Sequence, residues 1–173
     1  MRCFIGIPVP PALAATLAAT PFSLPARPVP ENNLHLTLAF LGERSRSQLE
    51  PLLPALESVL TRLPAFTVTL TTLDAFPEPG ARIWAAHARR EPALLALHGT
   101  IWHLLTQAGL DAESRPFLPH VTLARGAAPL RAEARPGPWV LPVDSVMLYE
   151  SPPDGHYQVL KEWPLATSSC RSG

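Results

Sequence analysis

The sequence predicts an α+β fold in which short strands outnumber helices and a strand hairpin closes the chain. Three observations support this class. Segments that alternate apolar and polar residues are interspersed with segments of helical character, most of the 22 prolines fall where an element should begin or end, and two strands flank the turn PPDG at residues 152–155. Because several strands follow one another without an intervening helix, a doubly wound parallel sheet is disfavoured.

The first half of the chain is expected to form three strands and two helices. Pro10 and Pro11 open the first helix, Gly42 ends the second strand, and Ser45 or Ser47 caps the second helix. The expected segments are a strand at 3–9, a helix at 12–20, a proline-rich loop at 23–33, a strand at 34–42, a helix at 48–62 and a β-branched strand at 66–73.

The second half is expected to add one helix and four strands, which gives the order β-α-β-α-β-β-α-β-β-β. Pro92 occupies the first turn of the helix and Gly109 stops it. The expected segments are a turn at 74–82, a strand at 83–88, a helix at 92–108, a loop and strand at 115–125, and hairpin strands at 139–151 and 156–165.

Composition indicates one compact domain over residues 1–173. Apolar residues make up 47% of the chain and charged residues 16%, and the formal net charge is zero. A protein that grips duplex DNA through many phosphates usually carries a basic excess, so duplex DNA is not an expected partner. Two cysteines, Cys3 and Cys170, stand apart and give no thiolate zinc motif; Cys3 is expected in the core and Cys170 in a polar tail.

The N-terminus has a basic residue, an apolar run and small residues, which resembles a secretory signal peptide. Prolines interrupt the run, however, and residues 3–9 fit a buried strand. We therefore expect a cytoplasmic protein, and no run in the sequence is long enough to span a membrane.

One pattern occurs twice, as HLTLAF at residues 35–40 and HVTLAR at residues 120–125. A composition estimate gives roughly 0.07 copies of HxTL in a chain of this make-up, so two copies favour a paired site. Alternate residues of a strand share a face, so His35 and Thr37 point one way while the leucines between them point into the core. His120 and Thr122 repeat the arrangement.

Two imidazoles and two hydroxyls fit in-line cleavage of a phosphodiester without a metal. Near neutral pH one histidine can act as a neutral base that activates water while another, protonated, donates to the leaving oxygen. Threonine hydroxyls can donate to the phosphate oxygens that gain charge. The residues alone do not say which histidine is the acid.

HLTLAFLGE and PFLPHVTLAR together resemble the two signatures of the 2H phosphoesterases, specifically the RNA 2′,3′-cyclic phosphodiesterases, historically called 2′-5′ RNA ligases. The resemblance covers almost the whole chain. It implies a bilobal fold with pseudo-two-fold symmetry, in which two antiparallel sheets flank a central cleft, helices lie outside, and each lobe supplies one HxT strand.

By position, the resemblance makes His35 the general acid and His120 the general base, with Thr37 and Thr122 binding phosphate. It implies hydrolysis of a terminal 2′,3′-cyclic phosphate to a 2′-phosphomonoester, and a possible reverse reaction that joins RNA ends. Expected partners are RNA with cyclic phosphate ends or nucleoside cyclic phosphates. We expect no metal, no cofactor, no membrane and a monomer.

Arg125 corresponds to a basic residue common in the family and is a further candidate phosphate ligand. Strict alternation places it on the face opposite His120, although a twist at the strand end could return its guanidinium to the phosphate. Phe40 has the matching position in the first motif, where we expect a core residue in preference to a base-stacking platform.

Two alternatives remain open at this point. The same fold could hydrolyse 2′,5′-oligonucleotides or cyclic phosphates of ADP-ribose. The protein could also be a non-catalytic module that binds RNA ends or nucleotides; the intact histidines and threonines count against that. His98 and His103 lack HExxH spacing, and we expect them at the surface or at an interface, whereas His87 is expected in the core or at the rim of the cleft.

Overall fold

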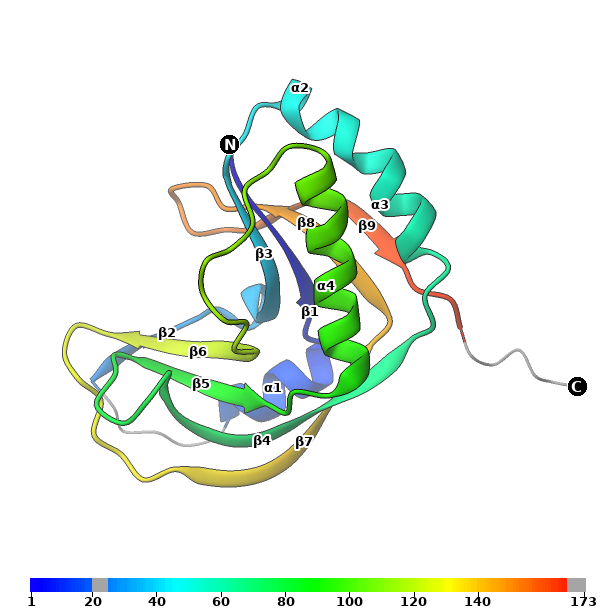
Figure 1. Ribbon diagram of the computed structural model, residues 1–173. Helices are drawn as coiled ribbons and strands as arrows, with labels where there is room; N and C mark the ends of the chain where they lie inside the picture. The colour runs from blue at the N-terminus through cyan, green and yellow to red at the C-terminus, as the bar shows by residue number, and fades with distance from the viewer. Residues whose placement is uncertain (20–24, 168–173) are drawn as a thin grey trace, which may run out of the picture.

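The computed structural model describes residues 1–19 and 25–167 and confirms the α+β class. Its strands form an antiparallel sheet in the order β7-β4-β5-β6-β3-β1-β8-β9, with β2 paired to β6 as a branch (Figure 1). The strands are β1 (Arg2–Pro8), β2 (Ala26–Pro28), β3 (His35–Glu43), β4 (Phe66–Phe76), β5 (Ile83–Ala88), β6 (His120–Gly126), β7 (Arg135–Val143), β8 (Ser145–Glu150) and β9 (Gln158–Pro164).

The sheet has two halves that meet along the two histidine strands. One half contains β3, β1, β8 and β9, and the other contains β6, β5, β4 and β7. Between β3 and β6 the register contains the single pair Leu36–Val121, whereas the other neighbouring strands pair over several residues. The two sheets expected from the sequence are therefore joined at one point, and each half contributes one HxT strand to the junction.

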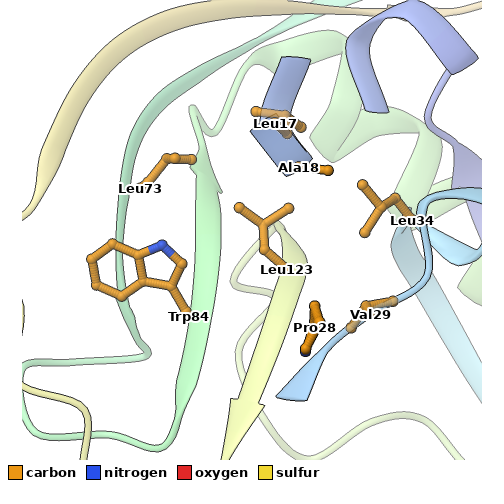
Figure 2. Close-up of a pocket in the computed structure, with 8 residues that line it drawn as sticks. All are labelled: Leu17, Ala18, Pro28, Val29, Leu34, Leu73, Trp84 and Leu123. Carbon is orange, nitrogen blue, oxygen red and sulfur yellow. The ribbon is translucent and has the colours of Figure 1, made fainter. Parts of the chain in front are cut away.

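Helices α4 and α1 each pack on the half-sheet that does not contain the strand preceding them in the chain. Helix α4 (Pro92–Gln107) follows β5 but lies over β1 and β3 (Figure 1), where the indole Nε1 of Trp102 donates to the carbonyl of Leu38 at 3.2 Å. Helix α1 (Pro11–Ala19) follows β1 and presents Leu17 to β4, β5 and β6 (Figure 2). This exchange of helices fixes the two half-sheets against each other.

A small cavity of about 40 Å³ lies beneath α1 (Figure 2). Its lining comes from α1, three strands and the segment around β2: Leu17, Ala18, Pro28, Val29, Leu34, Leu73, Trp84 and Leu123. None of these side chains is charged, and Leu123 and Leu34 turn away from the histidine face of their segments. The cavity is a packing void of the core and offers nothing that would hold a polar substrate.

The helix expected at residues 48–62 is divided by its prolines. Ser45 is its N-cap and forms a capping box with Gln48, so Ser45, and not Ser47, starts the segment. The helical segments are α2 (Arg46–Leu49), a 3₁₀ turn (Glu50–Leu52) and α3 (Leu53–Leu60). Pro51 and Pro54 lie in the first turns of the second and third segments, where their missing amide protons cost nothing.

Two sequence predictions about strands were wrong. The expected loop at 23–33 contains β2, which pairs antiparallel with β6, followed by the 3₁₀ helix Glu31–Asn33. The strand expected at 139–151 is two strands, which part at Asp144 and pair at distant places in the sheet, β7 with β4 and β8 with β1. The expected closing hairpin was correctly predicted and is formed by β8 and β9.

The core is continuous across both halves of the sheet. Trp84 and Trp163 are among the largest fully buried side chains, and Cys3 is a free thiol that is 1% exposed, as expected. Cys170 lies outside the described residues. No helix in the described ranges is both long enough and apolar enough to cross a membrane.

Candidate active site

The two HxT segments carry their histidines and threonines on the open face of the sheet. His35, Thr37, His120 and Thr122 are each half-buried, whereas Leu36 and Val121 between them are fully buried. Because Leu36 pairs with Val121, the two histidine strands lie side by side at the junction of the two half-sheets. Thr37 of the first motif and His120 of the second thus line one cleft, whereas His35 and Thr122 are not among its lining residues.

Both imidazoles are held by a backbone carbonyl two residues before them. Nδ1 of His35 lies 2.7 Å from the carbonyl oxygen of Asn33, and Nδ1 of His120 lies 2.8 Å from that of Leu118. A carbonyl can only accept, so Nδ1–H donates in each case, and in the neutral ring Nε2 carries the lone pair. Nε2 of His35 lies 2.9 Å from the Thr37 hydroxyl, which donates to it.

A β-bulge in each strand changes which residues share the histidine face. In β3, Ala39 pairs with Ile5 and Thr37 with Gly6, so Leu38 is the extra residue. In β6, Ala124 pairs with Trp84 and Thr122 with Ala85, so Leu123 is the extra residue. Both bulges leave two successive residues buried, after which the alternation restarts one residue later.

The bulges overturn two predictions made from strict alternation. Phe40 is not a core residue: it is 65% exposed and lines the cleft together with Thr37. Arg125 is exposed and pairs with Ile83, which also lines the cleft, so Arg125 shares the face of His120. The positive charge of Arg125 lowers the pKa of both His35 and His120, which places the guanidinium near both rings.

The two histidines lie in different surroundings. Burial lowers the pKa of His35 to about 4, against the opposing effect of the hydrogen bond to Asn33, and Phe4, Tyr149 and Tyr157 surround its ring. Burial also lowers the pKa of His120, and the neighbouring His87 contributes to that shift. Both rings are therefore neutral at pH 7 in the free protein.

Aromatic and loop residues that the sequence did not single out complete the site. The ring of Phe76 stacks on His120 with 3.6 Å between centroids, which fixes the plane of the imidazole. The cleft has a volume of about 750 Å³, and its far wall is the segment between α4 and β6, residues 112–118, which Figure 1 shows descending from the end of α4 to the start of β6.

His98 anchors this segment to α4 and is not a free surface residue. Its ring stacks on Phe117 with 3.9 Å between centroids, and its Nε2 lies 3.6 Å from a carboxylate oxygen of Glu113. Arg90 donates to the carbonyl of Phe117. His98 is partly covered, because the wall of the cleft folds back over the helix.

Asn33 is the buried polar residue behind His35. It is 5% exposed, and its side-chain amide donates to the carbonyl of Gly155 in the β8–β9 turn at 2.7 Å. Its own carbonyl holds His35, so Asn33 couples the turn that carries Tyr157 to the orientation of the imidazole. The signal available in the sequence was its place two residues before the motif.

Within residues 1–19 and 25–167, no group of three or more His, Cys, Asp or Glu side chains is arranged to hold a metal ion.

A cleft built from one HxT strand of each half-sheet defines the class of the two-histidine phosphoesterases. The chain belongs to the 2′-5′ RNA ligase superfamily, whose sequence profile matches residues 9–151. This match confirms the family predicted from the two motifs.

Similar proteins agree in sequence and in fold. An RNA 2′,3′-cyclic phosphodiesterase of Escherichia coli is 34% identical, with 95% of this chain and 96% of that protein covered. One of Thermus thermophilus is 38% identical over 75% of this chain and 70% of that protein. The chain spans only 37% of the length of one from Geobacillus stearothermophilus.

Solved structures extend the likeness to the whole chain. A Thermus thermophilus crystal structure has a TM-score of 0.81 and 32% identity, with 97% of this chain and 100% of that chain covered. A crystal structure of Escherichia coli LigT complexed with 3′-AMP has a TM-score of 0.78 and 31% identity, with 95% and 97% covered.

Replacing Phe40 and Leu38 separately tests the bulge in β3. We expect Phe40→Ala to change the free energy of unfolding by no more than about 0.5 kcal/mol, because the ring is mostly exposed. Leu38→Ala should cost about 2–5 kcal/mol, because Leu38 is 1% exposed. Chemical denaturation measures both, and equal losses would contradict the assigned register.

The low pKa of His35 predicts a pH-dependent stability. Between pH 6.5 and about 4 the unfolded chain binds a proton at this residue and the folded protein does not, so the free energy of unfolding falls as the pH is lowered through that interval. Denaturation at pH 7, 5.5 and 4.5 should give a shallower decline for His35→Gln than for the wild type. Parallel curves would show that His35 keeps its ordinary pKa.

Proposed function

We propose that this protein is an RNA 2′,3′-cyclic phosphodiesterase that opens a terminal cyclic phosphate to a 2′-phosphomonoester. The observation that carries the proposal is the matched pair of imidazoles, each with Nδ1–H tied to a backbone carbonyl, on adjacent strands of one cleft. The names of the similar Escherichia coli and Thermus thermophilus proteins support the same activity.

The proposed reaction transfers one proton at each histidine. Nε2 of His120 takes a proton from water, whose oxygen attacks phosphorus. The bond from phosphorus to the ribose O3′ breaks, and Nε2–H of His35 gives its proton to O3′. The product keeps the phosphate on O2′, His120 releases its proton to solvent, and a solvent proton restores His35.

The proposed ligands of the phosphate lie on the strand faces that carry the two histidines. Thr37 and Thr122 lie on their strands beside the histidines, so their hydroxyls are available to the non-bridging oxygens. The Thr37 hydroxyl donates to His35 in the free protein and would turn to the phosphate once His35 is protonated. Arg125 adds a permanent positive charge on the same face.

His35 needs a proton that it does not hold in the free protein at pH 7. A bound cyclic phosphate is an anion beside the ring, and a nearby negative charge favours the imidazolium, so substrate raises the pKa of His35 from about 4. Binding of the substrate and protonation of His35 are then coupled. The general base His120 needs no such help, because its lowered pKa keeps it neutral.

We also propose that the protein works in the cytoplasm as a monomer and that the reaction can run in reverse to join RNA ends. Residues 1–19, whose composition resembles a signal peptide, supply the buried strand β1 and the helix α1, which packs on the core through Ala14 and Leu17. That role supports a segment retained in the working protein.

Replacing either histidine tests the catalytic assignment. On adenosine 2′,3′-cyclic phosphate, His35→Ala and His120→Ala should each lower kcat by about 10²- to 10⁴-fold, the usual contribution of one acid or base. His103→Ala, which removes an exposed histidine from α4, is the matched control and should keep the wild-type rate. Near wild-type turnover by either active-site variant would remove that histidine from the mechanism.

Metal removal tests whether the two histidines suffice. Because the proposed steps use only side chains and water, kcat should be unchanged after exhaustive dialysis against EDTA. The same assay separates the alternatives through its substrates: faster turnover of 2′,5′-oligonucleotides or of ADP-ribose cyclic phosphate would reassign the substrate. Tight binding of adenosine 2′-phosphate with no hydrolysis of the cyclic form would identify a binding module.

A further inference from the structure

Two arginines face each other at the end of the second histidine strand. Arg27 on β2 pairs directly with Arg125 on β6, in an antiparallel register that continues to Ala26–Gly126. Directly opposed residues of an antiparallel pair point to the same face with Cβ atoms about 5 Å apart. Arg27 therefore lies on the face of Arg125, which is the face of the cleft.

No acidic side chain in the described ranges neutralises either guanidinium. Both residues are exposed, and among residues 1–19 and 25–167 neither side chain forms an ion pair or a hydrogen bond. Arg82 brings a third basic residue to the same end of the strand, where its carbonyl accepts a hydrogen bond from the amide of Gly126 at 2.7 Å. Like charges placed opposite each other destabilise a strand pair. The arrangement destabilises the strand pair and leaves the N–H donors of two guanidinium groups open to solvent. Such a pair of donors can bind an anion.

The Arg27–Arg125 pair lies a short distance along the strand from the proposed site of the reacting phosphate. Arg125 is three residues from Thr122, a separation of at most about 10 Å along a strand. A terminal ribose carries the cyclic phosphate on O2′ and O3′ and the next phosphate of the RNA on O5′, across the same sugar. A second anion site one sugar away from the threonines is where that phosphate would lie.

We propose that Arg27 and Arg125 form a subsite for the phosphate on the 5′ side of the terminal nucleoside. The inference rests on the proposed function and adds the substrate class, namely RNA ends and 5′-phosphorylated nucleotides in preference to simple nucleoside cyclic phosphates. Arginine suits the role because its fork of donors matches phosphate oxygens in pairs.

The test compares two substrates that differ in one phosphate, adenosine 2′,3′-cyclic phosphate and the same nucleotide with a 5′-phosphate. The wild type should have the higher kcat/KM for the 5′-phosphorylated substrate. Arg27→Gln should lower the ratio of the two kcat/KM values about tenfold, the effect of losing one hydrogen bond between charged groups, and the change should lie in KM. Arg62→Gln makes the same charge change at an exposed residue after α3 and should leave the ratio unaltered.

An unchanged ratio in Arg27→Gln, or an equal fall for both substrates, would overturn the subsite. Turnover of adenosine 2′,3′-cyclic phosphate by the wild type reports separately on the proposed function. If neither substrate is hydrolysed, calorimetry with 3′-AMP and adenosine 3′,5′-bisphosphate still decides the point. The bisphosphate should then bind more tightly to the wild type, and Arg27→Gln should remove that advantage; no such difference would overturn the subsite.

Discussion

The cleft depends on one register pair, Leu36 with Val121, at which the two half-sheets meet. A slip of one residue in either strand would send its histidine and threonine into the core and its leucines into the cleft. The register is fixed by burial on the core face, because Leu36 and Val121 are fully buried and α4 packs on β3, where the Trp102 indole donates to the carbonyl of Leu38. Two segments far apart in the sequence thus reach a common cleft through hydrophobic burial, and the polar groups follow from the alternation.

Within that frame, backbone carbonyls determine the chemistry of the rings. Each Nδ1–H is committed to the carbonyl two residues upstream, which leaves Nε2 as the reactive atom on both sides. The carbonyls are themselves fixed. Asn33 is bound to the β8–β9 turn through Gly155, and Leu118 belongs to a wall that His98 and Arg90 attach to the neighbouring helix region. Residues with no part in the chemistry thereby orient the groups that carry it.

The sequence was sufficient for the fold class, the family and the four polar residues of the two motifs, because these follow from a period of two in short strands. It could not show the bulges at Leu38 and Leu123, since an extra residue is defined only against the partner strand. Phe40 and Arg125 were therefore assigned to the wrong face. β2 was missed for a similar reason: three residues that end in proline have no strand pattern of their own and are ordered by β6. The division at Asp144 was missed because apolar residues on both sides of it continue the pattern of a strand.

The two half-sheets share the same bulge after the HxT motif but carry different side chains around it. This difference gives a physical reason for the two histidines to have different catalytic roles. The same bulge places an exposed Phe40 after the first motif and a charged Arg125 after the second. The ring of His35 is enclosed by three aromatic side chains, whereas His120 stacks on Phe76 and faces a second histidine. A nucleotide is asymmetric in the same sense, with an apolar base on one side of the ribose and anionic phosphates on the other. In the proposed reaction the aromatic half is available to the base and the basic half to the phosphates, and binding in one orientation would decide which ring meets the leaving oxygen.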